Sequence, residues 1–218
     1  MPIIYLFGTD GSGKSTLARL LACRLKRQGI RTKHSWMRGS HTFVSVLSRF
    51  LSRFDSFKNG PNPYYEIKIP KRLVKLWYFL EYVSSLPTIL LKFVFPSFFG
   101  WLVIADRYVI DLVVWVALIT NDDSFLRTVF AKHLVSLALR SKCRFFIVAD
   151  LKELARRSGE NATWLSRQLC LYESLGLQAY TINTTEKDPE GSLEEILNIL
   201  KRCSECGMQL QDTKFRKA

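Results

Sequence analysis

The stretch Gly8-Thr9-Asp10-Gly11-Ser12-Gly13-Lys14-Ser15 fits the phosphate-binding loop pattern G-x-x-x-x-G-K-[ST]. Residues 3–7 before it are apolar and predict a short buried strand, and residues 16–25 after it carry apolar side chains at helical spacing. A glycine loop between a strand and a helix N-terminus gathers backbone N–H groups, and the helix dipole adds to their positive potential. The stretch therefore predicts a site for a polyphosphate, in preference to a simple glycine-rich turn.

Three side chains of this loop have chemical roles in the prediction. Lys14 would reach the β- and γ-phosphates of ATP, and the Ser15 hydroxyl would be a ligand of Mg²⁺. Asp10 is unusual, because a carboxylate among phosphates faces like charge. We expect Asp10 to accept a hydrogen bond from a hydroxyl of a second substrate, or to approach the metal.

Length and charge set broad limits on the kind of protein. The 218 residues suit one α/β domain, which we place at residues 1–200 and follow with a basic tail at 201–218. The formal charge of +13 indicates anionic partners, although a solvated basic surface explains it equally well. The chain opens on the core strand instead of a secretory signal, so we expect a cytoplasmic protein.

Five strand-like runs separated by helical segments predict the fold. The runs are residues 3–7, 32–37, 102–105, 145–149 and 179–182. Such alternation is typical of a parallel sheet covered on both faces, here a three-layer α/β/α fold with five strands. Ligands of such sheets bind beyond the carboxyl ends of the strands. Polar residues follow these strands, among them Arg38, Asp106, Arg107, Asp150 and Asn183.

Asp106 and Arg107 come directly after the third apolar run. A carboxylate at the end of a neighbouring strand can hold the Mg²⁺ shell or orient the nucleophile, and the alternative is that Asp106 caps the helix near Val109. A guanidinium beside bound phosphates is a bidentate phosphate clamp, and the alternative for Arg107 is a surface ion pair with Asp111. Both residues are therefore candidates for catalysis and for binding of the phosphate acceptor.

A short lid is expected at about residues 151–163. Arg156 and Arg157 lie there with a glycine hinge nearby, which suits a segment that closes over the transferring phosphate and excludes water. The alternative is an ordinary basic helix end. Arg38 is a further candidate for the acceptor phosphate, with a solvated loop arginine as the equal alternative.

Residues 41–100 form an aromatic and basic region that we expect to be mostly helical and on the acceptor side. Charged residues and two prolines interrupt the apolar stretch 73–99, which argues against a membrane-spanning helix. One helical face of it predicts core or a subunit interface instead, so we expect a homodimer and neither a membrane nor a nucleic-acid partner. That face carries Leu73, Leu76, Trp77, Leu80 and Val83.

The cysteines give little functional information. Cys203-x-x-Cys206 is only half of a structural zinc motif, and the three histidines are distant in sequence. A zinc site, a disulfide and two plain thiols all stay open, with plain thiols favoured.

At this point the chain resembles the thymidylate kinase family of P-loop nucleoside-monophosphate kinases. The loop continues into Thr16 and matches the family's Asp-Gly-Ser-Gly-Lys-Ser-Thr form, including the unusual aspartate. Asp106-Arg107-Tyr108 matches the family's Asp-Arg-Tyr motif after a buried strand. The run 150–157 matches the passage from strand to lid, and 181–184 resembles the strand end near the adenine.

The resemblance implies a role for each matching residue. The loop residues Gly8 to Thr16 and Asn183 would bind ATP, and Ser15 and Asp106 would hold Mg²⁺. Asp10 would contact the sugar side of the acceptor, and Arg107, with Tyr108 beside it, would bind the acceptor's 5′-phosphate. Arg156 or Arg157 would act from the lid on the transition state.

Two departures from the family pattern fall in the acceptor pocket. The family's Thr-Arg-Glu-Pro-Gly segment is here Trp36-Met37-Arg38-Gly39-Ser40, which shares only the arginine and the glycine. The helix before the third strand, residues 76–82, lacks the arginine that helps the family read thymine and phosphate. An aromatic stack on a base could come from several residues: Phe57, Tyr64, Tyr65 or Phe79.

The sequence therefore predicts an ATP- and Mg²⁺-dependent kinase of a nucleoside monophosphate, with dTMP the first choice of acceptor. The nearest alternative is the same fold acting on another nucleotide, a nucleoside or a small metabolite. A third reading is a P-loop ATPase associated with nucleic acid or a membrane, which the Asp in the loop and the Asp-Arg-Tyr motif disfavour.

Overall fold

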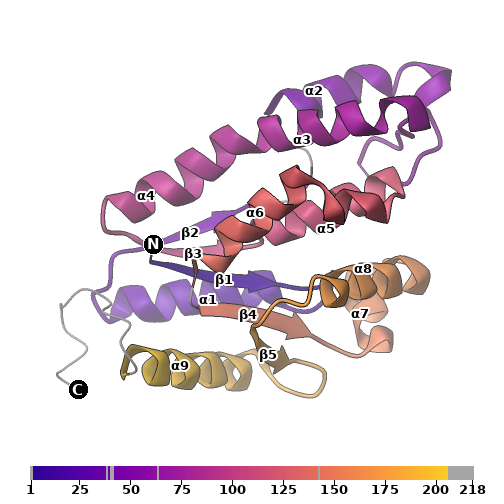
Figure 1. Cartoon of the computed structure of the whole chain (residues 1–218). Helices are drawn as coiled ribbons and strands as arrows, with labels where there is room; N and C mark the ends of the chain where they lie inside the picture. Colours follow the sequence, from indigo (N-terminus) through magenta and orange to yellow (C-terminus); the bar gives the residue numbers. More distant parts are fainter. Residues whose placement is uncertain (1, 38, 40–41, 63, 142, 206–218) are drawn as a thin grey trace.

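Five parallel strands form the central sheet of the computed structural model, in the order β2-β3-β1-β4-β5 (Figure 1). The model describes residues 2–37, 39, 42–62, 64–141 and 143–205. The strands are β1 (Ile3–Phe7), β2 (Thr32–Trp36), β3 (Leu102–Asp106), β4 (Cys143–Val148) and β5 (Tyr180–Asn183). The expected α/β class and parallel sheet are confirmed, and β4 begins two residues before the predicted start.

Helices cover both faces of this sheet. One layer contains α1 (Lys14–Arg27) and α9 (Pro189–Glu205), and they pack with β1, β3 and β4 around residues such as Leu21, Ile104 and Ile196. The other layer is built on α5 (Val109–Thr120), whose side chains are almost all buried. Its neighbours are α3 (Val74–Ile89), α6 (Val129–Leu139) and α8 (Ala162–Ser174). The three-layer α/β/α architecture is therefore as predicted.

Shorter helices complete the chain. They are α2 (Thr42–Leu51), α4 (Phe95–Phe98), α7 (Leu151–Ser158) and the 3-10 turns η1 (Asp55–Phe57), η2 (Lys71–Leu73) and η4 (Asp123–Arg127). A π-helical segment, η3 (Leu90–Val94), joins α3 to α4. Helix α9 runs to Glu205, so the boundary placed at residue 200 falls inside a helix.

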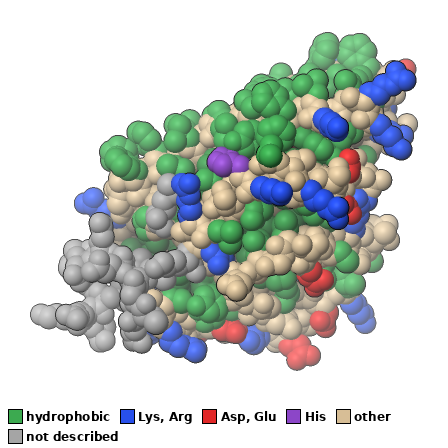
Figure 2. Space-filling view, in the orientation of Figure 1, with side chains coloured by type: hydrophobic (Ala, Val, Ile, Leu, Met, Phe, Trp, Pro, Cys, Tyr) green, Lys and Arg blue, Asp and Glu red, His purple; other side chains and the backbone are tan. Residues whose placement is uncertain are grey.

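The helical run Lys71–Phe98 is the one stretch of the described residues that is long and apolar enough to cross a membrane. One side of it packs on the core through residues such as Trp77, Ser85 and Phe93. The other side exposes apolar side chains, and hydrophobic groups crowd this upper surface in Figure 2. The run therefore packs on the core with one side and leaves an apolar outer face uncovered.

The strand register brings the polar residues of the sequence analysis to one edge. Leu6 of β1 pairs with Asp106 of β3, and Phe7 pairs with Phe146 of β4. On the outer strands, Trp36 pairs with Asp106 and Val148 with Asn183. The carboxyl ends of all five strands thus converge around the loop that follows β1.

Candidate active site at the carboxyl edge of the sheet

Two glycines of the loop between Phe7 and Lys14 have no room for a side chain. A Cβ on Gly8 would lie 2.2 Å from the Ile147 carbonyl oxygen, and one on Gly11 would lie 2.6 Å from that of Leu154. The loop therefore threads between β4 and α7. No side chain caps the N-terminus of α1 at Gly13, so its first N–H groups face the loop, an arrangement that suits a phosphate.

Lys14 is buried at the base of this loop. Its ammonium group donates to the Thr9 carbonyl and, over 3.1 Å, to the Ser12 hydroxyl. Burial, helped by the nearby Arg107, lowers the pKa of Lys14 to about 7. A lysine held in this way gains its full charge when an anion binds beside it.

Asp106 lies at the end of β3 with only 2% of its surface exposed. Its Oδ2 atom is 3.7 Å from His34 Nε2, while its buried Oδ1 atom has no hydrogen-bond partner among the described residues. Burial favours the neutral form, but contacts with His34 and Ser15 and the nearby cations hold the pKa of Asp106 below its usual range. The residue is thus a carboxylate beside the Ser15 hydroxyl.

Ser15 and Asp106 fit a Mg²⁺ ion that is shared with a nucleotide. A hydroxyl and a carboxylate are hard oxygen ligands, and Mg²⁺ in such sites takes its other ligands from phosphates and water. The orphaned Oδ1 atom of Asp106 is what such an ion would satisfy. Within the described part of the chain, no group of three or more His, Cys, Asp or Glu side chains could hold a metal by itself.

Arg107 is held between two carboxylates. Its Nη2 atom bonds to Asp10 of the phosphate loop, and its Nη1 atom is 3.6 Å from Asp111 Oδ1. The ion pair with Asp111 that the sequence left as an alternative is therefore present, but it is buried and shared with Asp10. Burial opposes the charge, and the two carboxylates together raise the pKa of Arg107 above its ordinary value. Its backbone is also in the left-handed region, with φ 65°.

Asp10 is fixed by a residue that sequence reasoning missed. Gln168 of α8 accepts a 2.9 Å hydrogen bond from the Asp10 backbone N–H and donates a 3.3 Å bond to its Oδ2 atom. Both residues are almost fully buried. The unusual loop carboxylate therefore faces Arg107 and α8. The positive charge of Arg107 offsets the negative charge of Asp10.

Asp111 is the centre of a second missed group. Tyr5 and Tyr172 each donate a 2.7 Å hydrogen bond to its carboxylate, and the Tyr108 backbone N–H donates a third of 3.1 Å. The last bond caps α5, so Asp106 is not the cap of this helix. Burial raises the pKa of Asp111, while Arg107 and Lys14 oppose the shift.

Tyr108 itself lies in the core. Only 2% of its surface is exposed, and its ring packs 4.5 Å from that of Phe93 and edge-on to Tyr5. The structure therefore gives the third residue of the Asp-Arg-Tyr motif a packing role in the core. Arg38 lies outside the described residues, as does Cys206.

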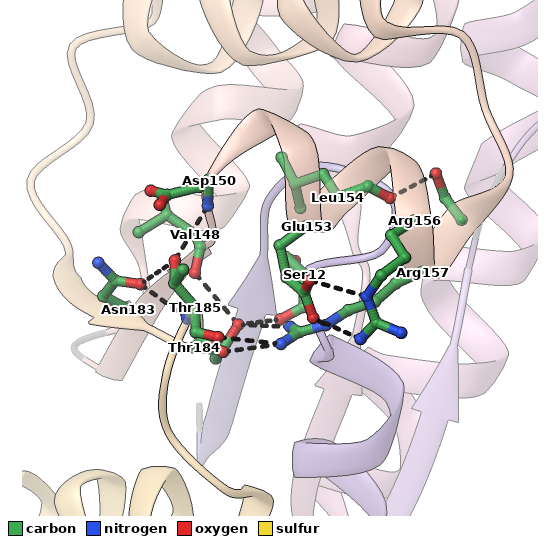
Figure 3. A network of polar contacts seen from close by, with 11 residues as sticks. Ser12, Val148, Asp150, Glu153, Leu154, Arg156, Arg157, Asn183, Thr184 and Thr185 are labelled. Carbon is green, nitrogen blue, oxygen red and sulfur yellow. Dashed lines mark hydrogen bonds and ion pairs between the residues drawn. The ribbon is translucent and has the colours of Figure 1, made fainter.

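The two lid arginines point in different directions (Figure 3). Arg156 pairs with Glu153 on the same helix, and 70% of its side chain is exposed. Arg157 also bonds Glu153, but it turns inward and donates to the Thr184 hydroxyl over 3.2 Å and to the Thr184 carbonyl over 3.0 Å. Arg157 is thus structural in this conformation, whereas Arg156 is accessible.

Thr184 connects the loop after β5 to the phosphate loop. Its hydroxyl donates to the Ser12 carbonyl at 3.1 Å and lies 3.2 Å from the Val148 carbonyl. Next to it, Asn183 Oδ1 accepts bonds from the N–H and hydroxyl of Thr185 (Figure 3). Asn183 therefore shapes a turn at the edge of the loop, close to where the nucleotide is expected.

An aromatic pair lies beside the segment that follows β2. The rings of Tyr64 and Trp115 are 5.3 Å apart, and both border Gly39, which directly follows Arg38. Trp115 was missed from the sequence because its run reads as uniform core, yet it lies one turn after Asp111 on α5. Phe79, by contrast, is on the outer face of α3 against Phe130. Among the aromatic candidates, Tyr64 borders Gly39.

No protein-family model matches this chain. No curated protein matches it either. What the site does is therefore inferred from its own residues.

Proposed function

We propose that this protein transfers the γ-phosphate of ATP to a nucleoside monophosphate, with dTMP as the preferred acceptor. The observation that carries the proposal is the buried pair of Asp10 and Arg107, in which a guanidinium is bonded to the phosphate loop. Hydrolytic P-loop sites also use arginines on the transferring phosphate, but they have no acceptor for a buried guanidinium to hold. A transferase needs one to hold an anionic acceptor in line with the γ-phosphate.

On the donor side, the N–H groups of the loop and the ammonium of Lys14 would hold the polyphosphate. Ser15 and Asp106 would hold Mg²⁺, which neutralises charge on the phosphates and keeps them in place. Asn183 and Thr184 would border the base. Little covalent chemistry falls to the protein, so positioning and electrostatic stabilisation supply most of the rate.

On the acceptor side, the 5′-phosphate would take the place of Asp10 at Arg107. Asp10 would then accept a hydrogen bond from a sugar hydroxyl, the role expected for it from the sequence. Tyr64, which is exposed and packs against the buried Trp115, offers a ring face for the base. The choice of dTMP rests on the resemblance to thymidylate kinases, whereas phosphoryl transfer rests on the charged residues.

The lid would contribute through Arg156. Its guanidinium is exposed and tied only to Glu153 of its own helix, so a small movement of α7 can bring it to the transferring phosphate. Such closure would exclude water and favour transfer over hydrolysis.

The proposal is tested with purified protein, Mg²⁺-ATP and a panel of acceptors. The panel contains dTMP, the other nucleoside monophosphates, nucleosides and small phosphorylated metabolites, and the readouts are ADP and the mass of the product. We expect dTDP in a one-to-one ratio with ADP. A product from another acceptor only would move the assignment to the alternative kinase, and ADP with free phosphate alone would contradict transfer.

A second candidate function has one observation in its favour. The apolar outer face of the helical run Lys71–Phe98 and the charge of +13 suit a P-loop ATPase that works at an anionic membrane. This reading requires ATP hydrolysis that anionic lipid vesicles stimulate and no phosphorylated small molecule. The same panel, run with and without vesicles, separates the two functions.

We also propose that the protein works as a homodimer in the cytoplasm, where ATP is available. The outer face of α2, α3 and α4 exposes large apolar side chains in one region (Figure 2), which a second copy would cover. Among them are Phe43, Phe50, Leu76, Phe79, Leu90 and Phe98.

A further inference from the structure

Asp111 has more partners than a helix cap needs. A cap requires one oxygen to accept from the N–H group at the start of α5, and Oδ2 does this with Tyr108. The other oxygen, Oδ1, accepts from the Tyr172 hydroxyl and faces Arg107 at 3.6 Å. With 3% of its surface exposed, a carboxylate here is costly unless its charge is used.

Two tyrosines determine how the Asp111 carboxylate is oriented. Tyr5 comes from β1 and Tyr172 from α8, so elements far apart in the chain each fix one oxygen. Both hydroxyls are fully buried, and burial raises their pKa values, so they act as donors at neutral pH. The carboxylate therefore has one orientation, in which Oδ1 points toward the guanidinium.

The two carboxylates that face Arg107 differ in their surroundings. Asp10 belongs to the phosphate loop and competes with any anion that enters. Asp111 lies behind two phenol hydroxyls, where an entering phosphate cannot displace it. A guanidinium tied only to Asp10 would be released when a phosphate arrived, whereas one also held by Asp111 stays in position.

We propose that Asp111, oriented by Tyr5 and Tyr172, is a positioning residue that holds the Arg107 guanidinium toward the phosphate of the acceptor. This inference rests on the proposed function, because it assigns Arg107 to an anionic acceptor. Asp111 acts chiefly on acceptor binding, because its Oδ1 atom faces Arg107, with a smaller electrostatic effect on Lys14 of the phosphate loop.

The central variant is Asp111→Asn, which keeps an oxygen for the Tyr108 N–H group and removes the charge. We expect the KM for the acceptor to rise by about 10-fold, because one of the two buried carboxylates that hold the guanidinium loses its charge, with the KM for ATP within about 2-fold of wild type. In an Arg107→Lys background, Asp111→Asn should raise the KM for the acceptor by less than about 2-fold, because the guanidinium that Asp111 holds is already gone. The proposal would be overturned if Asp111→Asn raised the KM for the acceptor and the KM for ATP equally. It would also be overturned if the effect of Asp111→Asn were as large in the Arg107→Lys background as in wild type.

Thr128→Ala is the matched control for lost capping. The Thr128 hydroxyl accepts from the Ala131 N–H group at the start of α6, an element that contributes none of the site residues named above. We expect this variant to lower Tm without changing the KM for the acceptor. If it raised that KM as Asp111→Asn does, a general loss of helix stability would explain both results.

A measurement without substrate separates this inference from the proposed function. In ¹⁵N-labelled protein, the Nη resonances of Arg107, assigned by their absence in Arg107→Lys, report rotation of the guanidinium. We expect restricted rotation in wild type and in Thr128→Ala, and faster rotation in Asp111→Asn. Unchanged rotation in Asp111→Asn would overturn the inference, even if dTMP is phosphorylated.

Failure of either part is recognisable. If the wild-type protein phosphorylates no acceptor, the proposed function fails, and the resonances still decide whether Asp111 holds Arg107. If Asp111→Asn does not fold, Tyr172→Phe carries both measurements, because it removes the hydroxyl that fixes Oδ1. A smaller change in the same direction supports the proposal, and wild-type behaviour contradicts it.

Discussion

Lys14 carries a charge that the folded protein disfavours until an anion arrives. Burial lowers its pKa to about 7, so at pH 8 most of the protein has a neutral Lys14. A polyphosphate beside the ammonium raises that pKa again, and a proton must be taken up from solution.

We therefore predict that nucleotide binding at pH 8 takes up about one proton, and much less at pH 6, where Lys14 is already charged. Titration calorimetry in buffers with different ionisation enthalpies measures this uptake. Lys14→Met, which cannot titrate, provides the control. Equal uptake in wild type and Lys14→Met would show that another group takes the proton.

At the scale of elements, the phosphate loop depends on its contact with α7. Gly11 and Gly29 both have a left-handed backbone, with φ of 80° and 81°. A Cβ on Gly11 would meet the Leu154 carbonyl, while one on Gly29 would meet nothing within 4 Å. A side chain would therefore meet the same backbone strain at both positions, but only at Gly11 would it also meet a neighbouring carbonyl group.

We predict that Gly29→Ala lowers the unfolding free energy by about 1 kcal/mol, the cost of left-handed backbone with a side chain. Gly11→Ala should cost more and also raise the KM for ATP, because the loop has to move away from α7. Urea unfolding and steady-state kinetics measure the two effects. Equal stability losses and an unchanged KM would contradict the role given to this contact.

The lid helix offers a second matched pair. Arg156→Ala should lower kcat and leave Tm nearly unchanged, because its exposed ion pair contributes little to stability. Arg157→Ala should instead lower Tm and raise the KM for ATP, because it removes bonds to Thr184. The reverse pattern would show that the two arginines exchange roles when the lid closes.

The elements were predictable from sequence because their signals are local. Apolar runs ended by polar residues located all five strands, and the glycine pattern located the loop. The contacts of Asp111 were not predictable, because Tyr5 is 106 residues away and Tyr172 is 61 residues away in the chain. Gln168 was missed for the same reason, and Tyr5 also reads as an ordinary strand residue.

Across the whole molecule, the main unexplained feature is the apolar surface over α2, α3 and α4. We predict a particle of twice the 25.2 kDa chain mass, and a monomer for Leu76→Glu, because Leu76 is 53% exposed in the middle of this face. Light scattering after size exclusion measures both. Leu151→Glu, on α7, is the control and should stay dimeric.

A wild-type monomer at micromolar concentration would contradict the dimer. If that monomer also bound anionic vesicles through the same face, the membrane-associated ATPase would become the better account. Lys71, Arg72 and Lys75, exposed beside Leu76, are the charges that such vesicles would meet.

The most direct test of the central claim is a ³¹P NMR time course of Mg²⁺-ATP and dTMP with wild-type protein and with Lys14→Ala. We predict that wild type forms dTDP and ADP in equal amounts, and that Lys14→Ala is slower by about 10²-fold or more while it remains folded. Free phosphate without dTDP from the wild-type protein, or a near-normal rate in Lys14→Ala, would contradict phosphoryl transfer to dTMP at this loop.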